Sequence, residues 1–146
     1  MNGLFYLRKG VVYIPTMARE QSGIYCHVEP VFSVPVADEI GFRTIFQKLV
    51  AQGNPLIPNR PRDIRGESPI LKLAGLKTFS AFARDTLVWG VEDLGGFYTI
   101  LPYKDGKPRG WVPDRERKVE FAPGTAEDEV ADRLVSMIQA ADAVGQ

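Results

Sequence analysis

The chain has 146 residues, of which 45% are hydrophobic and 25% charged, a composition typical of one globular domain. Its 18 basic and 18 acidic residues cancel, which argues against a general binder of nucleic acid or of membrane surfaces. The single cysteine excludes an internal disulfide framework and a multi-cysteine zinc site. We therefore expect a single domain over residues 1–146 with no cofactor and no metal.

No targeting segment is recognisable at the start of the chain. Arg8 and Lys9 interrupt the apolar stretch where the hydrophobic part of a signal peptide would lie. No run approaches the roughly 18 consecutive apolar residues of a membrane span. Together with the lone Cys26, these features predict a cytoplasmic protein.

The N-terminal part is predicted to be β-structure. Apolar, aromatic and β-branched residues fill the segments 4–7, 11–14, 24–28 and 31–34. Pro30 separates the last two segments, and proline cannot donate a hydrogen bond to a neighbouring strand. A β-bulge or an edge position is therefore expected at Pro30.

A helix follows, and then a loop rich in proline and arginine. Apolar residues recur at helical spacing from Phe42 to Val50, with Asp38 placed to cap the start and Gly53 to end the helix. The loop over 54–67 carries Arg60, Arg62 and Arg65. Ser68 and Pro69 then resemble an N-cap and a first helical residue, opening a short helix that ends at Gly75.

The second half alternates strands and turns before a closing helix. The segment 77–84 fits a helical turn or a strand, and the spacing of Phe79 and Phe82 favours the helix. Strands are predicted over 86–91, 96–101, 110–112 and 118–121, with turns at 92–95 and 104–107. The last helix is expected to start with Thr125 as its cap, paired with Asp128, and to bury a stripe formed by Val130, Leu134, Val135 and Ile138. This order predicts an α+β fold in which an antiparallel β-sheet meander packs against helices.

The lone histidine is the first candidate for catalysis, because Cys26 stands beside it. Consecutive strand residues point to opposite faces, however, so Cys26 and His27 cannot form a hydrogen-bonded dyad. A buried cysteine and a hydrogen-bonded histidine explain both residues. No nucleophile elbow, phosphate-binding loop, dinucleotide fingerprint or zinc motif occurs, so we expect no enzyme.

Charged residues cluster in four places. The acids at 127–129 fall in the first turn of the last helix, where the helix dipole favours negative charge. Glu92 and Asp93 are expected in a turn. Basic residues collect in the 60–65 loop and along the 103–118 hairpin, where they alternate with Tyr103 and Trp111. Basic residues among aromatics can bind single-stranded nucleic acid. A solvated hairpin is the favoured explanation, because Asp105, Asp114 and Glu116 dilute the charge and the chain has no net charge.

Part of the chain resembles the small immunity proteins of bacterial contact-dependent inhibition and other polymorphic toxin systems. The resemblance lies in the segments 77–82, 87–91, 96–100 and 110–112 and in the closing helix. It implies a compact α+β protein that binds one cognate toxin domain, often a nuclease, and blocks its active site or its access to substrate. Many such inhibitors are acidic, whereas this chain has no net charge.

The leading hypothesis is therefore an immunity protein whose partner is the C-terminal domain of a toxin. An interface of this kind needs aromatic or arginine anchors together with charges that orient the partner. We expect these on exposed loops and hairpin tips, at Arg60, Arg62, Glu92, Asp93, Tyr103, Asp105, Arg109 and Trp111. If substitutions on that surface leave the affinity unchanged, we expect the interface at the acids of the last helix, Glu127, Asp128 and Asp132. The alternative function is a module that binds nucleic acid or a small ligand through the 103–118 hairpin.

Overall fold

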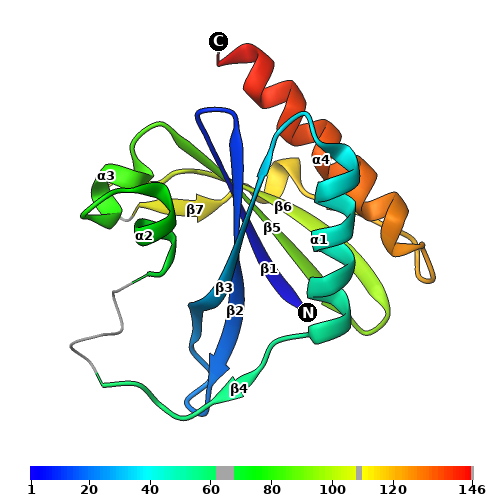
Figure 1. Cartoon of the computed structure of the whole chain (residues 1–146). Coiled ribbons are helices and arrows are strands. Elements are labelled where there is room, and N and C mark those ends of the chain that lie inside the picture. Colours follow the sequence, from blue (N-terminus) through cyan, green and yellow to red (C-terminus); the bar gives the residue numbers. More distant parts are fainter. Residues whose placement is uncertain (62–67, 108–109, 146) are drawn as a thin grey trace.

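The computed structural model describes residues 1–61, 68–107 and 110–145 and places them in an α+β fold (Figure 1). Six strands follow one another across the sheet in the order β3-β2-β1-β5-β6-β7, while β4 pairs with β2 and β8 pairs with β6. All pairings are antiparallel except β2 with β4. The strands are β1 (Asn2–Arg8), β2 (Val11–Glu20), β3 (Tyr25–Pro35), β4 (Leu56–Ile57), β5 (Thr86–Leu94), β6 (Phe97–Asp105), β7 (Trp111–Pro113) and β8 (Val119–Glu120).

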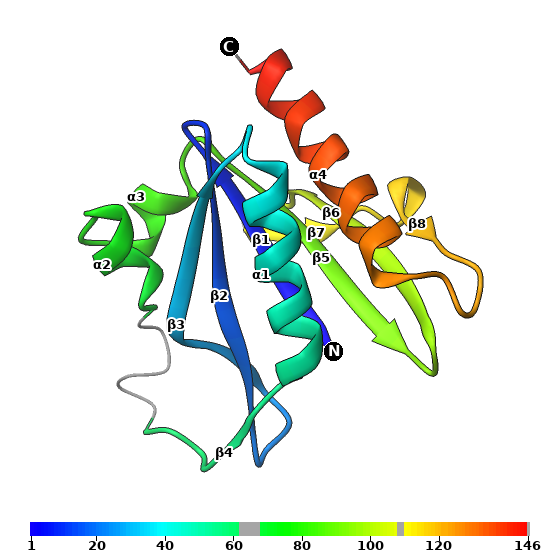
Figure 2. The same cartoon turned by 45° about the vertical axis from the view of Figure 1, so that its right-hand side comes forward.

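The helices differ greatly in length. Helix α1 (Glu39–Gln52) and helix α4 (Glu127–Val144) are long, whereas α2 (Ile70–Ala74), α3 (Phe79–Ala83) and the 3-10 turn η2 (Arg115–Arg117) are short. Helices α1 and α4 lie next to each other on one side of the sheet, and α2 and α3 lie together away from them (Figures 1 and 2). None of the helices in the described ranges is long and apolar enough to cross a membrane.

Alternate residues of β1 serve two separate apolar clusters. Phe5 and Leu7 are buried with residues of α1 and α4, among them Phe42, Phe46 and Leu134. Tyr6, one position away, belongs instead to a smaller cluster that contains Ile70 of α2 and Phe82 of α3. Because successive strand residues point to opposite faces, the sheet has one face under each pair of helices.

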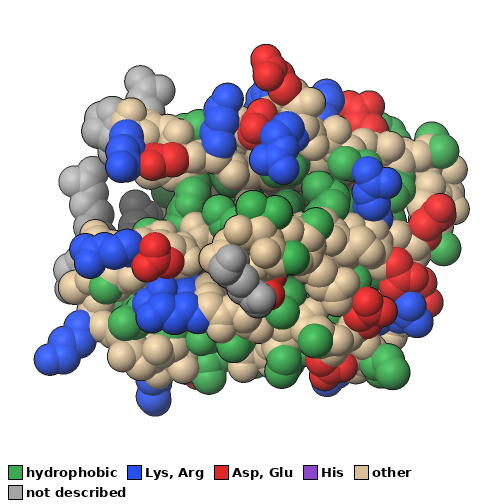
Figure 3. Space-filling model, turned by 90° about the horizontal axis from the view of Figure 1, so that it is seen from above, with side chains coloured by type: hydrophobic (Ala, Val, Ile, Leu, Met, Phe, Trp, Pro, Cys, Tyr) green, Lys and Arg blue, Asp and Glu red, His purple; other side chains and the backbone are tan. Residues whose placement is uncertain are grey.

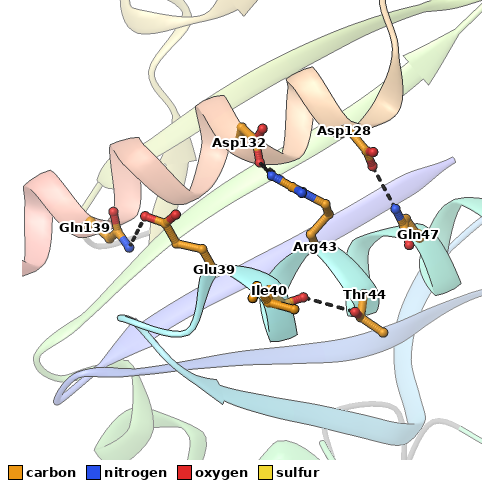
Figure 4. A network of polar contacts seen from close by, with 8 residues as sticks. All are labelled: Glu39, Ile40, Arg43, Thr44, Gln47, Asp128, Asp132 and Gln139. Atoms are coloured by element: carbon orange, nitrogen blue, oxygen red, sulfur yellow. Dashed lines mark hydrogen bonds and ion pairs between the residues drawn. The ribbon is translucent and has the colours of Figure 1, made fainter.

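Polar contacts join α1 to α4 above the larger cluster (Figure 4). Arg43 donates to Asp132 Oδ1 at 2.7 Å, and Gln47 donates to Asp128 Oδ1 at 2.8 Å. Gln139 of α4 donates to Glu39 of α1 at 3.2 Å. These side chains are exposed, so they align the two helices more than they stabilise them.

The sheet has an opening between β1 and β2, which pair only from Tyr6 to Arg8 on the β1 side. Beyond that point the two strands diverge (Figure 1). The carboxamide of Asn54 bridges the gap: its Oδ1 accepts from Asn2 N–H at 2.7 Å, and its Nδ2 donates to the carbonyls of Asn2 and Met17 at 2.8 Å. One side chain thus replaces the missing backbone hydrogen bonds.

The predicted fold class and most predicted elements are confirmed. Asp38 caps α1 by accepting from Gly41 N–H, and Gly53 follows the last helical residue. The 77–84 segment contains helix α3, capped by Thr78. Strand β3 lies at the sheet edge, and the register of its pairing with β2 shifts opposite the Pro30 region, as the position of Pro30 predicted.

The predicted turn at 92–95 is wrong, because β5 continues to Leu94 and β6 begins at Phe97. Only Gly95 and Gly96 form the turn, and both have the positive φ that glycine adopts without strain. Strand β6 also continues through Asp105, so Glu92, Asp93, Tyr103 and Asp105 are strand residues. Strand β2 likewise extends to Glu20, beyond the predicted 11–14 segment.

One predicted helix cap differs from the observed one. Thr125 donates to the carbonyl of Ala122, and α4 begins only at Glu127, so Thr125 and Asp128 form no capping pair. At α2 the prediction is confirmed, because Pro69 has helical dihedral angles and Ser68 Oγ accepts from Ile70 N–H at the start of the helix. The buried stripe of α4 is confirmed, with all four predicted residues below 5% exposure.

Candidate functional site

The face of the sheet that carries α2 and α3 is only partly covered and holds two adjoining cavities. The first has a volume of about 330 Å³ and the second about 310 Å³. Leu4, Met17 and Tyr25 line both cavities, so the two form one groove with an apolar middle beside the opening between β1 and β2. We call this feature the groove. Volumes of this size, with apolar walls and a few polar groups, are typical of binding sites.

His27 is held rigidly in the wall of the first cavity. Its Nε2 lies 2.9 Å from the Tyr6 hydroxyl of β1, and its Nδ1 lies 2.7 Å from Ser68 Oγ. Ser68 Oγ also accepts from Ile70 N–H at the start of α2, at 3.3 Å. The imidazole therefore ties the short helix to the sheet, which confirms the prediction of a hydrogen-bonded histidine.

The electrostatic environment keeps this histidine neutral. Burial, together with the nearby Arg60 cation, lowers the pKa of His27 to about 4. Burial also raises the pKa of the neighbouring Cys26 thiol, which is 7% exposed. A neutral imidazole with both nitrogens engaged and a protonated thiol are poorly suited to act together as base and nucleophile.

Arg60 lies in the same cavity beside a fully buried carboxylate. Its backbone N–H donates to Glu20 Oε1 at 2.9 Å, and its Nε lies 3.8 Å from Glu20 Oε2. The Arg60 side chain is 19% exposed. Its Nε has no hydrogen-bond partner among the described residues, so charge attraction and not a hydrogen bond joins this atom to Glu20.

Glu92 and Tyr103 line the second cavity. A side chain at Gly90 would meet the Tyr103 ring at 3.1 Å, so glycine allows this ring to lie against β5. Burial and the Glu92 carboxylate raise the pKa of Tyr103, so its hydroxyl stays protonated. In the described ranges no ion pair involves Glu92.

The structure brings together three of the predicted partner-binding residues, namely Arg60, Glu92 and Tyr103, around the groove. Trp111 packs with its ring centroid 5.7 Å from that of Tyr6 and 5.9 Å from that of Phe79, so it supports the same face from below the surface.

The other predicted residues lie elsewhere. Asp93 is next to Glu92 on β5 and points to the opposite face, where it acts on Tyr98. Asp105 forms an ion pair with Lys107. Arg62 and Arg109, like Arg65, fall outside the described residues.

Sequence reasoning missed the residues that make the middle of the groove. The sequence pattern places Leu4 in an apolar strand and assigns no role to Met17, yet both line the two cavities because β1 and β2 separate there. Tyr25, which is 41% exposed, is the first residue of β3, and an aromatic residue at the start of a strand is a signal that the sequence does offer. Among the described residues no cluster of histidine, cysteine and carboxylates could hold a metal ion.

The surface charges form no uniform track on the face shown in Figure 3, where basic and acidic side chains are interspersed with hydrophobic ones. The acids of α4 that are the second choice for the interface also take part in contacts within the protein. Asp132 pairs with Arg43, and Asp128 accepts from Gln47. Within the 103–118 hairpin, Lys107 and Asp105 pair at 3.6 Å.

Comparison with solved structures gives two similar folds. A protein of unknown function from Neisseria meningitidis superposes with a TM-score of 0.64 at 15% identity, covering 90% of this chain and 88% of that one. A chain of the CdiA-CT/CdiI toxin and immunity complex from Yersinia pseudotuberculosis superposes with a TM-score of 0.62 at 12% identity, covering 94% and 95%. No protein-family model and no curated protein matches the sequence. The fold is thus shared with a component of a toxin and immunity complex.

Proposed function

We propose that this chain is an immunity protein that binds a cognate toxin domain, a nuclease in the first instance, and blocks its active site or its access to substrate. The structural similarity to a chain of a toxin and immunity complex supports a protein partner. The sequence resemblance described above points to the immunity component of such a pair.

The groove is the observation that carries the proposal. It lies on the half-covered face of the sheet, and its apolar middle is flanked by three residues that the sequence had singled out. Tyr25 is 41% exposed and Ile24 is 47% exposed at its rim. Exposed aromatic and aliphatic groups around a depression with few charges are what a protein interface requires as anchors.

Binding without a reaction of its own is the mode that the site supports best. The lone histidine bonds to Tyr6 and Ser68 through both ring nitrogens. Its pKa, lowered to about 4 by burial, leaves it a weak base at neutral pH. We therefore propose that the protein inhibits by occupying a surface of the toxin.

The alternative, a nucleic-acid or small-ligand module on the 103–118 hairpin, receives less support. Single-stranded nucleic acid needs exposed aromatic faces on which bases stack. Trp111 instead packs against Tyr6 and Phe79, and Tyr103 lies over Gly90. The ion pair between Lys118 and Glu120 further reduces the free positive charge.

Co-expression with the toxin domain tests the proposal. The probe is the C-terminal domain encoded by the reading frame directly upstream of this gene, produced in cells with and without this protein. We expect this protein to restore growth and to bind an inactive form of that domain in isothermal titration calorimetry. If the wild-type protein neither protected the cells nor bound the domain, this result would contradict the proposed function.

A matched pair of variants locates the interface. Tyr25→Ala changes an exposed side chain in the groove, whereas Ile40→Ala changes a side chain that is 79% exposed on α1. We expect Tyr25→Ala to weaken binding by about tenfold or more, as the loss of an aromatic anchor does. Ile40→Ala is expected to leave the affinity unchanged. Binding of a single-stranded oligonucleotide by the wild-type protein, lost steeply with added salt, would instead favour the nucleic-acid alternative.

A further inference from the structure

The two ends of the groove carry opposite charges. Arg60 lines the first cavity and not the second, and Glu92 lines the second and not the first. Between them lie Leu4, Met17 and Tyr25, which the two cavities share. The strand order agrees with this arrangement, because Arg60 follows β4 on the β2 side of the opening and Glu92 sits on β5, which pairs with the β1 side.

The positive end has hydrogen-bonding capacity in reserve. A guanidinium has five N–H donors. In Arg60, these donors make no hydrogen bond to a described residue, and Glu20 Oε2 is 3.8 Å from Nε, beyond hydrogen-bond distance. The side chain is 19% exposed, so its free edge is reachable from the cavity. An oxyanion entering the cavity would meet a pre-positioned fork of donors.

The chemistry of the partner decides which anion enters. Glu20 is fully buried beside the guanidinium and offsets part of its positive charge. The planar N–H fork of a guanidinium matches the two oxygens of a carboxylate. A protein partner supplies such a group from an aspartate or a glutamate.

The negative end has a complementary need. Glu92 is partly buried and takes part in no ion pair with a described residue. It lines the cavity together with the Tyr103 hydroxyl and Asn2. A partly buried carboxylate without a cation is costly, and a lysine or arginine from a partner would relieve that cost.

We propose that the groove recognises a segment of the toxin domain in which an apolar side chain lies between an acidic and a basic side chain, the acid docking on Arg60 and the base on Glu92. The inference rests on the proposed function and specifies the partner surface that this function requires. The apolar middle supplies affinity, while the two charges fix the direction in which the segment enters.

Neutral substitutions at the two ends test the charge order. The probe is the same inactive toxin domain, titrated into Arg60→Gln, Glu92→Gln and the double variant. Truncating one partner of a largely desolvated charge pair costs enough to weaken binding about thirtyfold or more. We expect this loss for each single variant. Arg133→Gln and Glu129→Gln, exposed positions on α4, serve as matched controls and are expected to stay within threefold.

Substitutions in the toxin domain complete the test. Its Asp and Glu residues are changed singly to Asn and Gln, and its Lys and Arg residues to Gln. We expect one acidic position to couple to Arg60 and one basic position to couple to Glu92 in double-mutant cycles. If Arg60→Gln unfolds because Glu20 loses a neighbouring cation, Arg60→Lys keeps the charge. Arg60→Lys should weaken binding less than loss of the charge does, and it should still couple to the same acid.

The outcomes separate the two proposals. No binding by the wild-type protein overturns the proposed function. Wild-type binding with both Arg60→Gln and Glu92→Gln within threefold overturns the charge-ordered groove and leaves the proposed function standing. Loss at only one end, or coupling of both ends to toxin residues of the same sign, also overturns it.

Discussion

The two faces of the sheet receive alternate residues of the same strands, yet they are covered very differently. Helices α1 and α4, of 14 and 18 residues, close the first face over a cluster that includes Phe5, Phe46 and Leu134, all fully buried. Helices α2 and α3, of five residues each, cover the second face only in part, and the groove remains. The first face therefore buries the larger apolar cluster, whereas the second leaves a groove that a partner can reach.

The largest expected loss of stability comes from a substitution in the closed face. Leu134→Ala removes a fully buried side chain from the α4 stripe and leaves a cavity in the larger cluster. We expect the free energy of unfolding to fall by about 2–5 kcal/mol. Urea denaturation measures it, and Tyr25→Ala in the groove, as the comparison, should change stability far less. A loss under about half a kcal/mol for Leu134→Ala would show that α4 is not a main source of stability.

A smaller effect on stability is expected on the half-covered face, where it depends on pH through His27. The pKa of His27 is lowered to about 4 by burial, whereas the unfolded chain has a value near 6.5. Between these values the unfolded state binds more protons, so stability falls as the pH drops from about 6.5 towards 4. The loss reaches at most about 3 kcal/mol. Above pH 6.5 this contribution is complete.

Urea unfolding of the wild type and of His27→Gln at several pH values measures this contribution of His27 to stability. Glutamine keeps an amide donor and acceptor but does not titrate. We expect the difference in unfolding free energy between the two proteins to shrink as the pH falls through this window. A difference that stays constant from pH 7 to pH 4.5 would contradict the role given to His27.

The smallest of the three effects concerns the bridge between the halves of the sheet. Asn54→Ala leaves the Asn2 N–H and the carbonyls of Asn2 and Met17 without their partner. Unsatisfied, partly buried backbone groups of this kind cost about 1–3 kcal/mol. We also expect weaker binding to the toxin domain, because the groove borders the opening. Asn59→Ala, which removes a bond to the exposed Ser22 N–H, is the control, and equal losses for both variants would argue against a special role for Asn54.

The spacing of apolar residues predicted the closed face well, because each helix on that face shows its own buried stripe in the sequence. The spacing of apolar residues in α4 and around Phe42 and Phe46 in α1 was enough to identify buried stripes. The caps and the hairpin were less predictable. Glycines 95 and 96 formed the whole turn, so two acids predicted to lie in it belong to β5.

The groove could not be predicted from sequence, because its residues line a cavity only where β1 and β2 do not pair. Met17 would be an ordinary sheet residue had β1 continued alongside β2, and Asn54 reads as one more loop residue after Gly53. Arg60, Glu92 and Tyr103 are candidates in the sequence because they are charged or aromatic residues without another role in an expected loop, turn or hairpin. Their convergence depends on the strand order, in which β5 lies next to β1.

The Asn54 bridge also sets an order of assembly. Its carboxamide joins residues far apart in sequence and reaches them only when α1 lies on the sheet. The β2–β3 and β5–β6 hairpins involve neighbouring segments and pay less loop-closure entropy, so they form earlier. We therefore expect the groove to form late in folding and to open early in local fluctuations. Under the proposed function, a toxin domain seated there would slow that opening and would also lengthen the lifetime of the folded protein.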